Sequence, residues 1–75
     1  MTDYNNRIEA NPEIMFGKPC IKGTRVPVDL ILRKLAARWT YADIMDAYPR
    51  VKSEDIEACL LFAAESVQNE ILIAA

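Results

Sequence analysis

The segment FGKPCIKGTRVPV, residues 16–28, sets the direction in which the following helix leaves the N-terminal part of the chain. This segment holds both glycines of the chain and two of its four prolines, and no acidic residue interrupts it. Ile21-Lys22-Gly23-Thr24 predicts a tight turn, because glycine adopts a positive φ at little cost. Cys20-Ile21 and Arg25-Val26 are then the short arms of a β-hairpin, and Pro27 suits the start of a helix. We interpret the segment first as a structural scaffold that fixes the orientation of the helix beginning after Pro27.

The same segment does not have the pattern of a nucleotide phosphate loop. Such a loop needs four residues between its first glycine and a Gly-Lys-Ser/Thr end, whereas here Gly17-Lys18 is followed by Pro19. Proline has no N–H to contribute to a backbone cradle. Lys18, Lys22 and Arg25 still lie in one loop, where they are suited to binding phosphates or acidic groups of a partner. Arg25 is equally suited to a structural role on helix-end carbonyls.

Two helices are predicted directly after the hairpin. The first covers residues 28–38, with apolar side chains at helical spacing at Val28, Ile31, Leu32, Leu35 and Trp39. The second begins at a capping box formed by Thr40 and Asp43 and stops before Pro49. Its apolar stripe is Tyr41, Ile44, Met45 and Tyr48.

A third helix is predicted from Ser53, which is expected to be its N-cap, followed by the acidic pair Glu54-Asp55. Its apolar stripe is expected at Ile56, Cys59, Leu60, Ala63 and Val67, with Leu61 and Phe62 on another side. A helix that is apolar nearly all round is typically covered on more than one side. We therefore expect a second chain to cover part of it.

Length and composition indicate one small domain that needs a partner. A chain of 75 residues buries only about 60–65% of its unfolded surface, yet 52% of its residues are hydrophobic. We expect a homodimer or an obligate partner. No apolar run approaches the roughly 18 residues of a membrane span, and the first residues are polar. A cytoplasmic protein with no membrane contact is therefore expected.

The fold class predicted is mainly α, a small trihelical helix-turn-helix-like domain with a short N-terminal β-hairpin or β-arm. Residues 1–75 are expected to form a single domain, with the arm and hairpin over 1–27 and the helical part over 28–75. A helix-turn-helix layout is a pattern and does not by itself establish DNA binding.

The residue types present argue against catalysis and metal binding. The chain has no histidine and only two cysteines, Cys20 and Cys59. A zinc site needs about four nitrogen or sulfur ligands at recognisable spacing, which this chain cannot supply alone. Asp43 and Asp46 fit a solvated helix face better than an acid–base pair. We expect no enzyme activity, no catalytic residues, no metal and no cofactor.

Charge divides the chain into a basic part and an acidic part. Residues 1–52 carry all nine basic side chains against six acidic ones, whereas residues 53–75 carry five acidic side chains and no basic one. The candidate nucleic-acid-binding residues are Lys22, Arg25, Arg33, Lys34 and Arg38, through phosphate contacts. The candidate partner interface is Leu61, Phe62, Ile71, Leu72 and Ile73, because an exposed apolar tail would form a surface patch prone to association with another protein.

Two stretches closely resemble the prokaryotic domain of unknown function 433 family: NPEIMFGKPCIKGTRVPVDLI (residues 11–31) and WTYADIMDAYPRVKSEDIEACLLFAAE (residues 39–65). The resemblance spans about residues 8–65, and the GKP, IKGTRVPV, YP and EDIEA segments follow the family's order and spacing. It implies a small trihelical protein of helix-turn-helix type. Some members resemble VapB-type antitoxins, encoded beside a PIN-like ribonuclease toxin.

The function expected is therefore that of a non-catalytic, antitoxin-like protein that binds and neutralises a cognate PIN-like ribonuclease. An acidic third helix suits a basic nuclease surface. One alternative is a helix-turn-helix-type DNA-binding regulator, although the third helix places three acidic residues in its first turn, where they would repel phosphates. Another is a dimeric protein-interaction adaptor.

Overall fold

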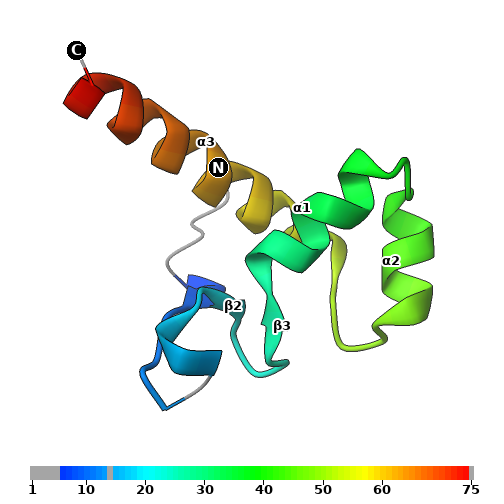
Figure 1. Cartoon of the computed structure of the whole chain (residues 1–75). Coiled ribbons are helices and arrows are strands. Elements are labelled where there is room, and N and C mark those ends of the chain that lie inside the picture. Colours follow the sequence, from blue (N-terminus) through cyan, green and yellow to red (C-terminus); the bar gives the residue numbers. More distant parts are fainter. Residues whose placement is uncertain (1–5, 14, 75) are drawn as a thin grey trace.

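The computed structural model of the chain describes the backbone of residues 6–13 and 15–74, and the side chains of all of these except 15 and 69–74. It contains three helices and a small three-stranded antiparallel sheet, so the fold is mainly helical (Figure 1). The elements follow in the order β1 (Ile8–Glu9), a 3-10 helix η2 (Met15–Gly17), β2 (Cys20–Ile21), β3 (Val26–Pro27), α1 (Val28–Ala36), α2 (Tyr41–Ala47) and α3 (Ser53–Ala74).

The predicted hairpin is confirmed with its second arm at Val26–Pro27 in place of Arg25-Val26, since Arg25 belongs to the turn, and β1 adds a third strand to it. The strand order is β1-β2-β3, with Ile8 opposite Ile21 and Cys20 opposite Pro27. The turn is closed by Thr24, whose N–H and hydroxyl both donate to the Ile21 carbonyl, at 3.1 and 2.8 Å. Gly23 has a φ of 80°, as the sequence predicts. Because the Val28 N–H donates to the Pro19 carbonyl at 2.9 Å, the sheet runs straight into α1.

Helix α1 is two residues shorter than predicted. It ends at Ala36 because Arg38 takes a φ of 72°, which an α-helix cannot accommodate. The N–H groups of Trp39 and Arg38 donate to the carbonyls of Lys34 and Leu35, at 3.0 Å each, and this is the pattern of a Schellman C-cap. At the other end, Pro27 is the N-cap residue and the last residue of β3, so Val28 is the first helical position.

Helix α2 begins as predicted. Thr40 Oγ1 accepts from the Asp43 N–H at 3.1 Å, and Asp43 Oδ2 accepts from the Thr40 N–H at 2.9 Å. This reciprocal capping box fixes the entry to the helix. Ile44 is fully buried on its inner face.

The start of α3 corrects one prediction, because Ser53 is the first helical residue and not the N-cap. Asp55 supplies the cap, since its Oδ2 accepts from the Lys52 N–H at 2.9 Å. The Ser53 hydroxyl donates instead to Glu54 Oε1 at 2.9 Å. The backbone N–H of Glu54 and the Ser53 hydroxyl lower the pKa of the Glu54 carboxyl, so the first turn stays negatively charged at the positive end of the helix.

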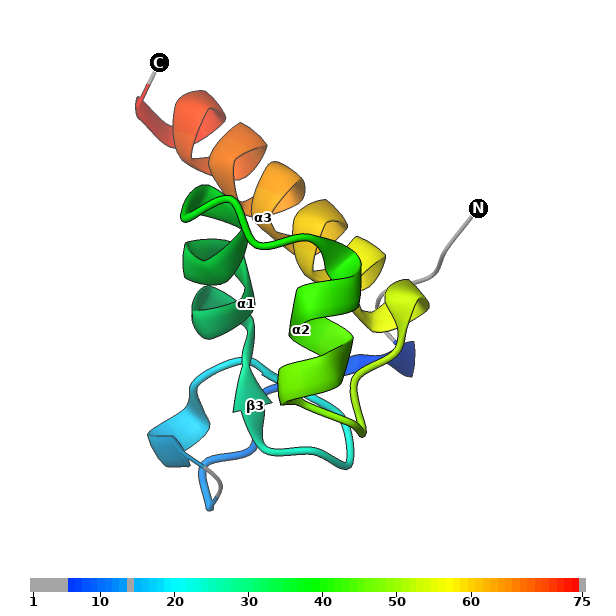
Figure 2. The same ribbon diagram turned by 90° about the vertical axis from the view of Figure 1, so that its right-hand side faces the viewer.

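The core lies where α3 packs against α1, α2 and β1 (Figure 2). Its buried members are Ile21, Val28, Ile31, Ile44, Val51, Ile56 and Cys59. The stripe predicted on α3 is partly wrong, because Leu60 and Val67 are exposed, at 42% and 55%. Phe62 packs against the core instead. The side of α3 that is buried is set by where α1 and β1 lie, which helical periodicity alone does not specify.

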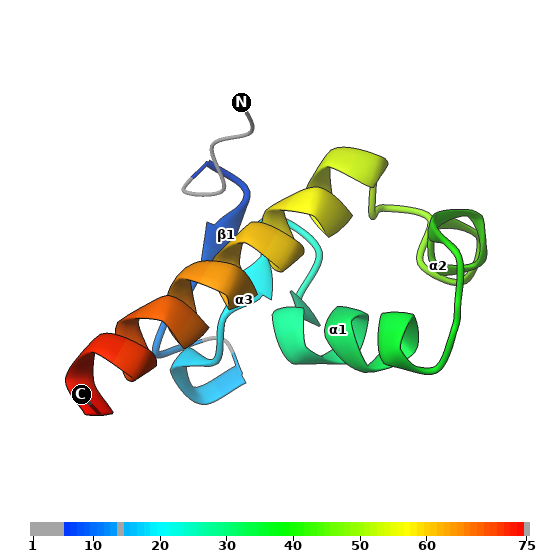
Figure 3. The same cartoon turned by 90° about the horizontal axis from the view of Figure 1, so that it is seen from above.

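Beyond Cys59, α3 contributes no buried side chain to the described part of the chain. Its later turns extend away from the sheet and the other two helices (Figures 1 and 3). We call residues 60–74 the distal half of α3. Of the helices in the described ranges, none combines the length and hydropathy that a membrane span requires.

Candidate functional site

A long-range ion pair organises the end of the molecule opposite the distal half of α3. Arg7 Nη1 lies 3.0 Å from Asp55 Oδ1, and Asp55 is only 7% exposed. The carbonyl of Arg7 also accepts from the Lys22 N–H at 2.7 Å. Because Asp55 also caps the Lys52 N–H, one chain of contacts links the β2–β3 turn to the start of α3.

This link brings four basic residues to one end of the fold. Two lie in the β2–β3 turn and two in the connection from α2 to α3, and they are Lys22, Arg25, Arg50 and Lys52. We call these four residues the cationic rim. All four side chains are exposed, and none has an ion-pair partner among the described residues. The rim therefore carries positive charge that no ion pair within the described residues neutralises, although Glu54 lies close enough to Lys52 to interact with it electrostatically.

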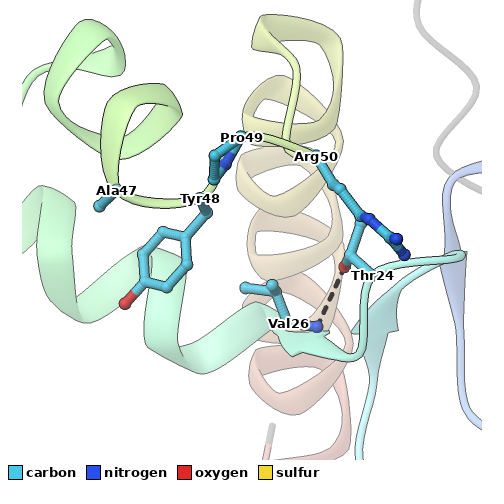
Figure 4. A pocket seen from close by; sticks show the side chains of 6 residues that line it. All are labelled: Thr24, Val26, Ala47, Tyr48, Pro49 and Arg50. Carbon is cyan, nitrogen blue, oxygen red and sulfur yellow. Dashed lines mark hydrogen bonds between the residues drawn. The ribbon is translucent and has the colours of Figure 1, made fainter.

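The β2–β3 turn and the α2–α3 connection border a shallow, open pocket of about 340 Å³. Its lining is Thr24, Val26, Ala47, Tyr48, Pro49 and Arg50 (Figure 4). In Figure 4, Tyr48 and Arg50 stand at opposite ends, with Val26 between them. The Thr24 hydroxyl accepts from the Val26 N–H at 3.0 Å, which holds one wall in place. The pocket thus has an apolar, aromatic end and a cationic end.

The five predicted nucleic-acid-binding residues do not form one cluster. Lys22 and Arg25 belong to the cationic rim, whereas Arg38 lies beyond the other end of α1, which spans about 13 Å. Arg33 lies 3.8 Å from Asp29, and Lys34 stacks over the Trp39 ring at 4.4 Å from its centroid. Two of the five are therefore engaged by neighbours.

Asp29 on α1 forms ion pairs with two basic residues. Its Oδ2 lies 3.1 Å from Lys18 Nζ as well as near Arg33. The i, i+4 spacing of Asp29 and Arg33 on one helix predicts their ion pair. The ion pair between Lys18 and Asp29 depends on the tertiary structure, which local spacing does not predict. Lys18 is thus held by a carboxylate and does not belong to the cationic rim.

Arg50 and Lys52 are basic residues suited to phosphate contacts, but they are not among the five residues predicted from the sequence to bind nucleic acid. The signal available was the segment Pro49-Arg50-Val51-Lys52, which is basic and lacks acidic residues. Its proximity to the β2–β3 turn depends on contacts across the chain, such as the Arg7–Asp55 ion pair between residues 48 positions apart.

The two cysteines are buried and unpaired. Burial raises the pKa of the Cys59 thiol to about 12, and the Asp55 charge adds to the effect. Burial also raises the pKa of Cys20, whose Sγ donates to the Lys18 carbonyl at 3.3 Å. Both thiols are therefore protonated and unreactive at neutral pH.

The distal half of α3 presents a second surface of possible function. Leu60, Ala64 and Val67 are exposed and recur at i, i+4 and i+7, so they share one side of the helix. We call these three residues the distal face. By the same spacing Ile71 occupies the next position of this register. Leu61 is half-buried and Phe62 packs on the core, whereas the side chains of Ile71, Leu72 and Ile73, also predicted as interface, lie outside the described residues.

Comparison with known proteins places the chain in a family. Residues 8–63 match a family described as "Protein of unknown function (DUF433)". The chain belongs to the DUF433 family. It is also similar to "Uncharacterized protein y4eO" of Sinorhizobium fredii (strain NBRC 101917 / NGR234), with 30% identity over 56 residues, or 75% of this chain. The chain spans about 25% of that relative's length, and no solved structure matches it.

Proposed function

We propose that this DUF433 protein is a non-catalytic, antitoxin-like protein that binds a cognate PIN-like ribonuclease through the distal half of α3. The observation that carries the proposal is that no described side chain of this half is fully buried and that Leu60 and Val67 are exposed, although Phe62 packs against the core. An amphipathic helix with anchors at i, i+4 and i+7 is suited to insertion into an apolar groove of another protein.

Charge favours a basic partner over a second copy of this helix. In sequence, residues 60–74 contain two acidic residues, Glu65 and Glu70, and no basic one, and Glu54 and Glu57 precede them on the same helix. Pairing α3 with another α3 would bring like charges together, whereas a basic groove would attract the helix and raise the association rate. The homodimer expected from composition is therefore less well supported on this surface than a complex with a basic protein.

The choice of a PIN-like ribonuclease rests on the resemblance to VapB-type antitoxins. An acidic helix that covers a basic, RNA-binding nuclease surface would block access of the RNA backbone. This mode of neutralisation needs no catalytic group on the DUF433 chain.

The test is calorimetric titration with a PIN-like ribonuclease, taken from the adjacent reading frame where one is encoded there. A double variant, Leu60→Asp with Val67→Asp, places charges on the distal face at exposed positions where folding should be preserved. Ala42→Asp, which adds a charge at an exposed position on α2, is the control. We expect the double variant to bind at least a hundredfold more weakly and the control to bind as the wild type. Equal affinities for all three proteins would refute docking through this face.

A DNA-binding regulator is a second candidate, favoured by the unpaired charge of the cationic rim. The helix order α1, α2, turn, α3 is compatible with a helix-turn-helix-like arrangement. Glu54 and Glu57 are exposed at the start of α3 and would repel phosphates, so contacts would come from the β2–β3 turn instead. Binding would then be largely independent of base sequence and would weaken steeply with salt.

Charge removal at the start of α3 separates the two candidates. The double variant Glu54→Gln with Glu57→Gln should strengthen a DNA mobility shift and slow association with a basic ribonuclease. Asp55 is left unchanged, because it carries the ion pair to Arg7 and its replacement would damage the fold. Loss of operator binding with intact neutralisation would instead make α3 a DNA reader.

A further inference from the structure

We propose that the pocket beside the cationic rim binds a nucleotide, with the base at its aromatic end and the phosphate at Arg50. The site would accept a free nucleotide or a nucleotide unit of a single strand. It lies at the β2–β3 turn, away from the distal half of α3 (Figure 1). The inference is therefore independent of docking through α3, and either can fail alone.

The shape of the pocket suits a flat group attached to an anion. Val26, Ala47, Pro49 and the Tyr48 ring give an apolar surface on which a base would stack, and such stacking tolerates any base. The pocket has a volume of about 340 Å³ and is shallow and open, so a bound base would keep one face toward solvent. The separation of Tyr48 from Arg50 in Figure 4 matches a ligand with one planar end and one charged end.

The charge of the rim favours a phosphate over a single carboxylate. Arg50 has no ion-pair partner in the described structure, and its planar guanidinium forms paired hydrogen bonds with phosphate oxygens. Lys22, Arg25 and Lys52 add three further cations, and no acidic residue occurs in segments 22–25 and 48–52. A doubly charged phosphate gains more from four cations than a singly charged group does.

Backbone strain at Arg25 supports a role for its side chain. Arg25 has a φ of 60°, a conformation that costs a non-glycine residue about 1–2 kcal/mol. It lies between Thr24 and Val26, which both line the pocket, and its side chain is exposed. A residue held in such a conformation is a candidate for a functional role, and we assign Arg25 a role in attracting an anion beside the pocket.

The test is an NMR titration of the ¹⁵N-labelled chain with adenosine monophosphate. We expect shifts of the Val26 and Ala47 amides, and at least tenfold weaker binding of adenosine or ribose 5-phosphate, which each lack one recognised part. An eight-residue oligodeoxyadenylate distinguishes the sources, since tighter binding than the mononucleotide at the same amides indicates a strand. Equal shifts with adenosine, an oligoglutamate peptide that binds as well, or no shift of pocket amides would overturn the proposal.

Variants of the two arginines separate binding from folding. Arg50→Gln should weaken binding of adenosine monophosphate about tenfold, and Arg50→Lys should restore part of it. Arg25→Gly should weaken binding severalfold while raising the melting temperature, because glycine relieves the strained φ. Arg25→Lys keeps the charge and the strain, so it should bind nearly as the wild type. Unchanged affinity in both Arg50→Gln and Arg25→Gly would contradict the assignment.

Discussion

At the residue scale, left-handed backbone conformations determine where the chain turns. Gly17 and Gly23 have φ values of 82° and 80°, and three other described residues, Phe16, Arg25 and Arg38, also have positive φ. Glycine adopts this conformation freely, whereas the others do so at a cost. Substitutions at these positions therefore change stability through the backbone more than through contacts.

Gly23→Val should destabilise the fold by about 2 kcal/mol or more, because a β-branched residue strongly resists a φ of 80°. A Cβ at this position would meet no atom within 4 Å, so the effect would come from strain and not from a clash. Urea unfolding measures it. Lys22→Ala, an exposed neighbour in the same turn, should leave stability nearly unchanged. If Gly23→Val unfolds at the wild-type urea concentration yet loses ligand binding, the turn is a binding loop and not a scaffold.

Arg38→Gly should have the opposite effect and stabilise the chain by about 1 kcal/mol. Arg38 occupies the C′ position of the Schellman motif, where glycine carries no penalty for a φ of 72°. Thermal unfolding of the two proteins, with heat capacity taken into account, gives the difference. A decrease in melting temperature would mean that the Arg38 side chain makes a stabilising contact that outweighs the strain.

Cys59 should make stability fall at high pH. Its thiol has a pKa of about 12 in the folded chain against an ordinary value of 9.0, so the contribution is complete below pH 9 and is lost as pH rises toward 12. The slope is at most about 1.4 kcal/mol per pH unit. Between pH 8 and 10.5 the wild type should lose about 2 kcal/mol more than Cys59→Ala in urea unfolding. Parallel profiles for the two proteins would show that the thiol titrates normally.

At the element scale, Asp55 joins the sheet to α3. It accepts from the Lys52 N–H at the helix start and pairs with Arg7, next to β1. Removing one partner from a pair that is largely buried leaves the other charge poorly solvated. The N-terminal strand β1 and the start of α3 are therefore coupled by this carboxylate in addition to the packing of β1 on α3.

Asp55→Ala should lower the free energy of unfolding by about 3 kcal/mol, since both the cap and the ion pair are lost. Asp55→Asn keeps an acceptor for the cap and should lie between this variant and the wild type. Glu57→Ala, at an exposed position in the same turn, should change stability by less than about 0.5 kcal/mol. Urea unfolding is again the measurement, and equal losses at Asp55 and Glu57 would refute this role.

The elements that sequence predicts well are those with local signals. The Thr40–Asp43 capping box, the turn at Gly23 and the stop before Pro49 each depend on residues a few positions apart. The role of Asp55 and the burial of Phe62 in place of Leu60 depend on partners far along the chain. The pocket has the same origin, because its two walls are separated by α1 and α2 in sequence.

At the scale of the whole molecule, the fold has two ends of different chemistry. One end carries the cationic rim and the pocket, and the other carries the acidic, partly apolar distal half of α3. The fully buried side chains that α3 contributes among the described residues all lie in its first turns, and Phe62 packs against the core from just beyond them, so the later turns gain little stability from tertiary packing. In the free chain their backbone hydrogen bonds should therefore open more readily than those of residues 53–59.

Hydrogen–deuterium exchange along α3 tests the central proposal most directly. The amides of the free chain and of its mixture with a PIN-like ribonuclease, taken from the adjacent reading frame where one is encoded there, would be compared residue by residue. Docking through the distal half predicts that exchange of residues 60–74 slows at least tenfold in the complex, while residues 53–59, already held by the core, change little. Slowed exchange confined to the β2–β3 turn, or unchanged exchange throughout residues 60–74, would contradict it.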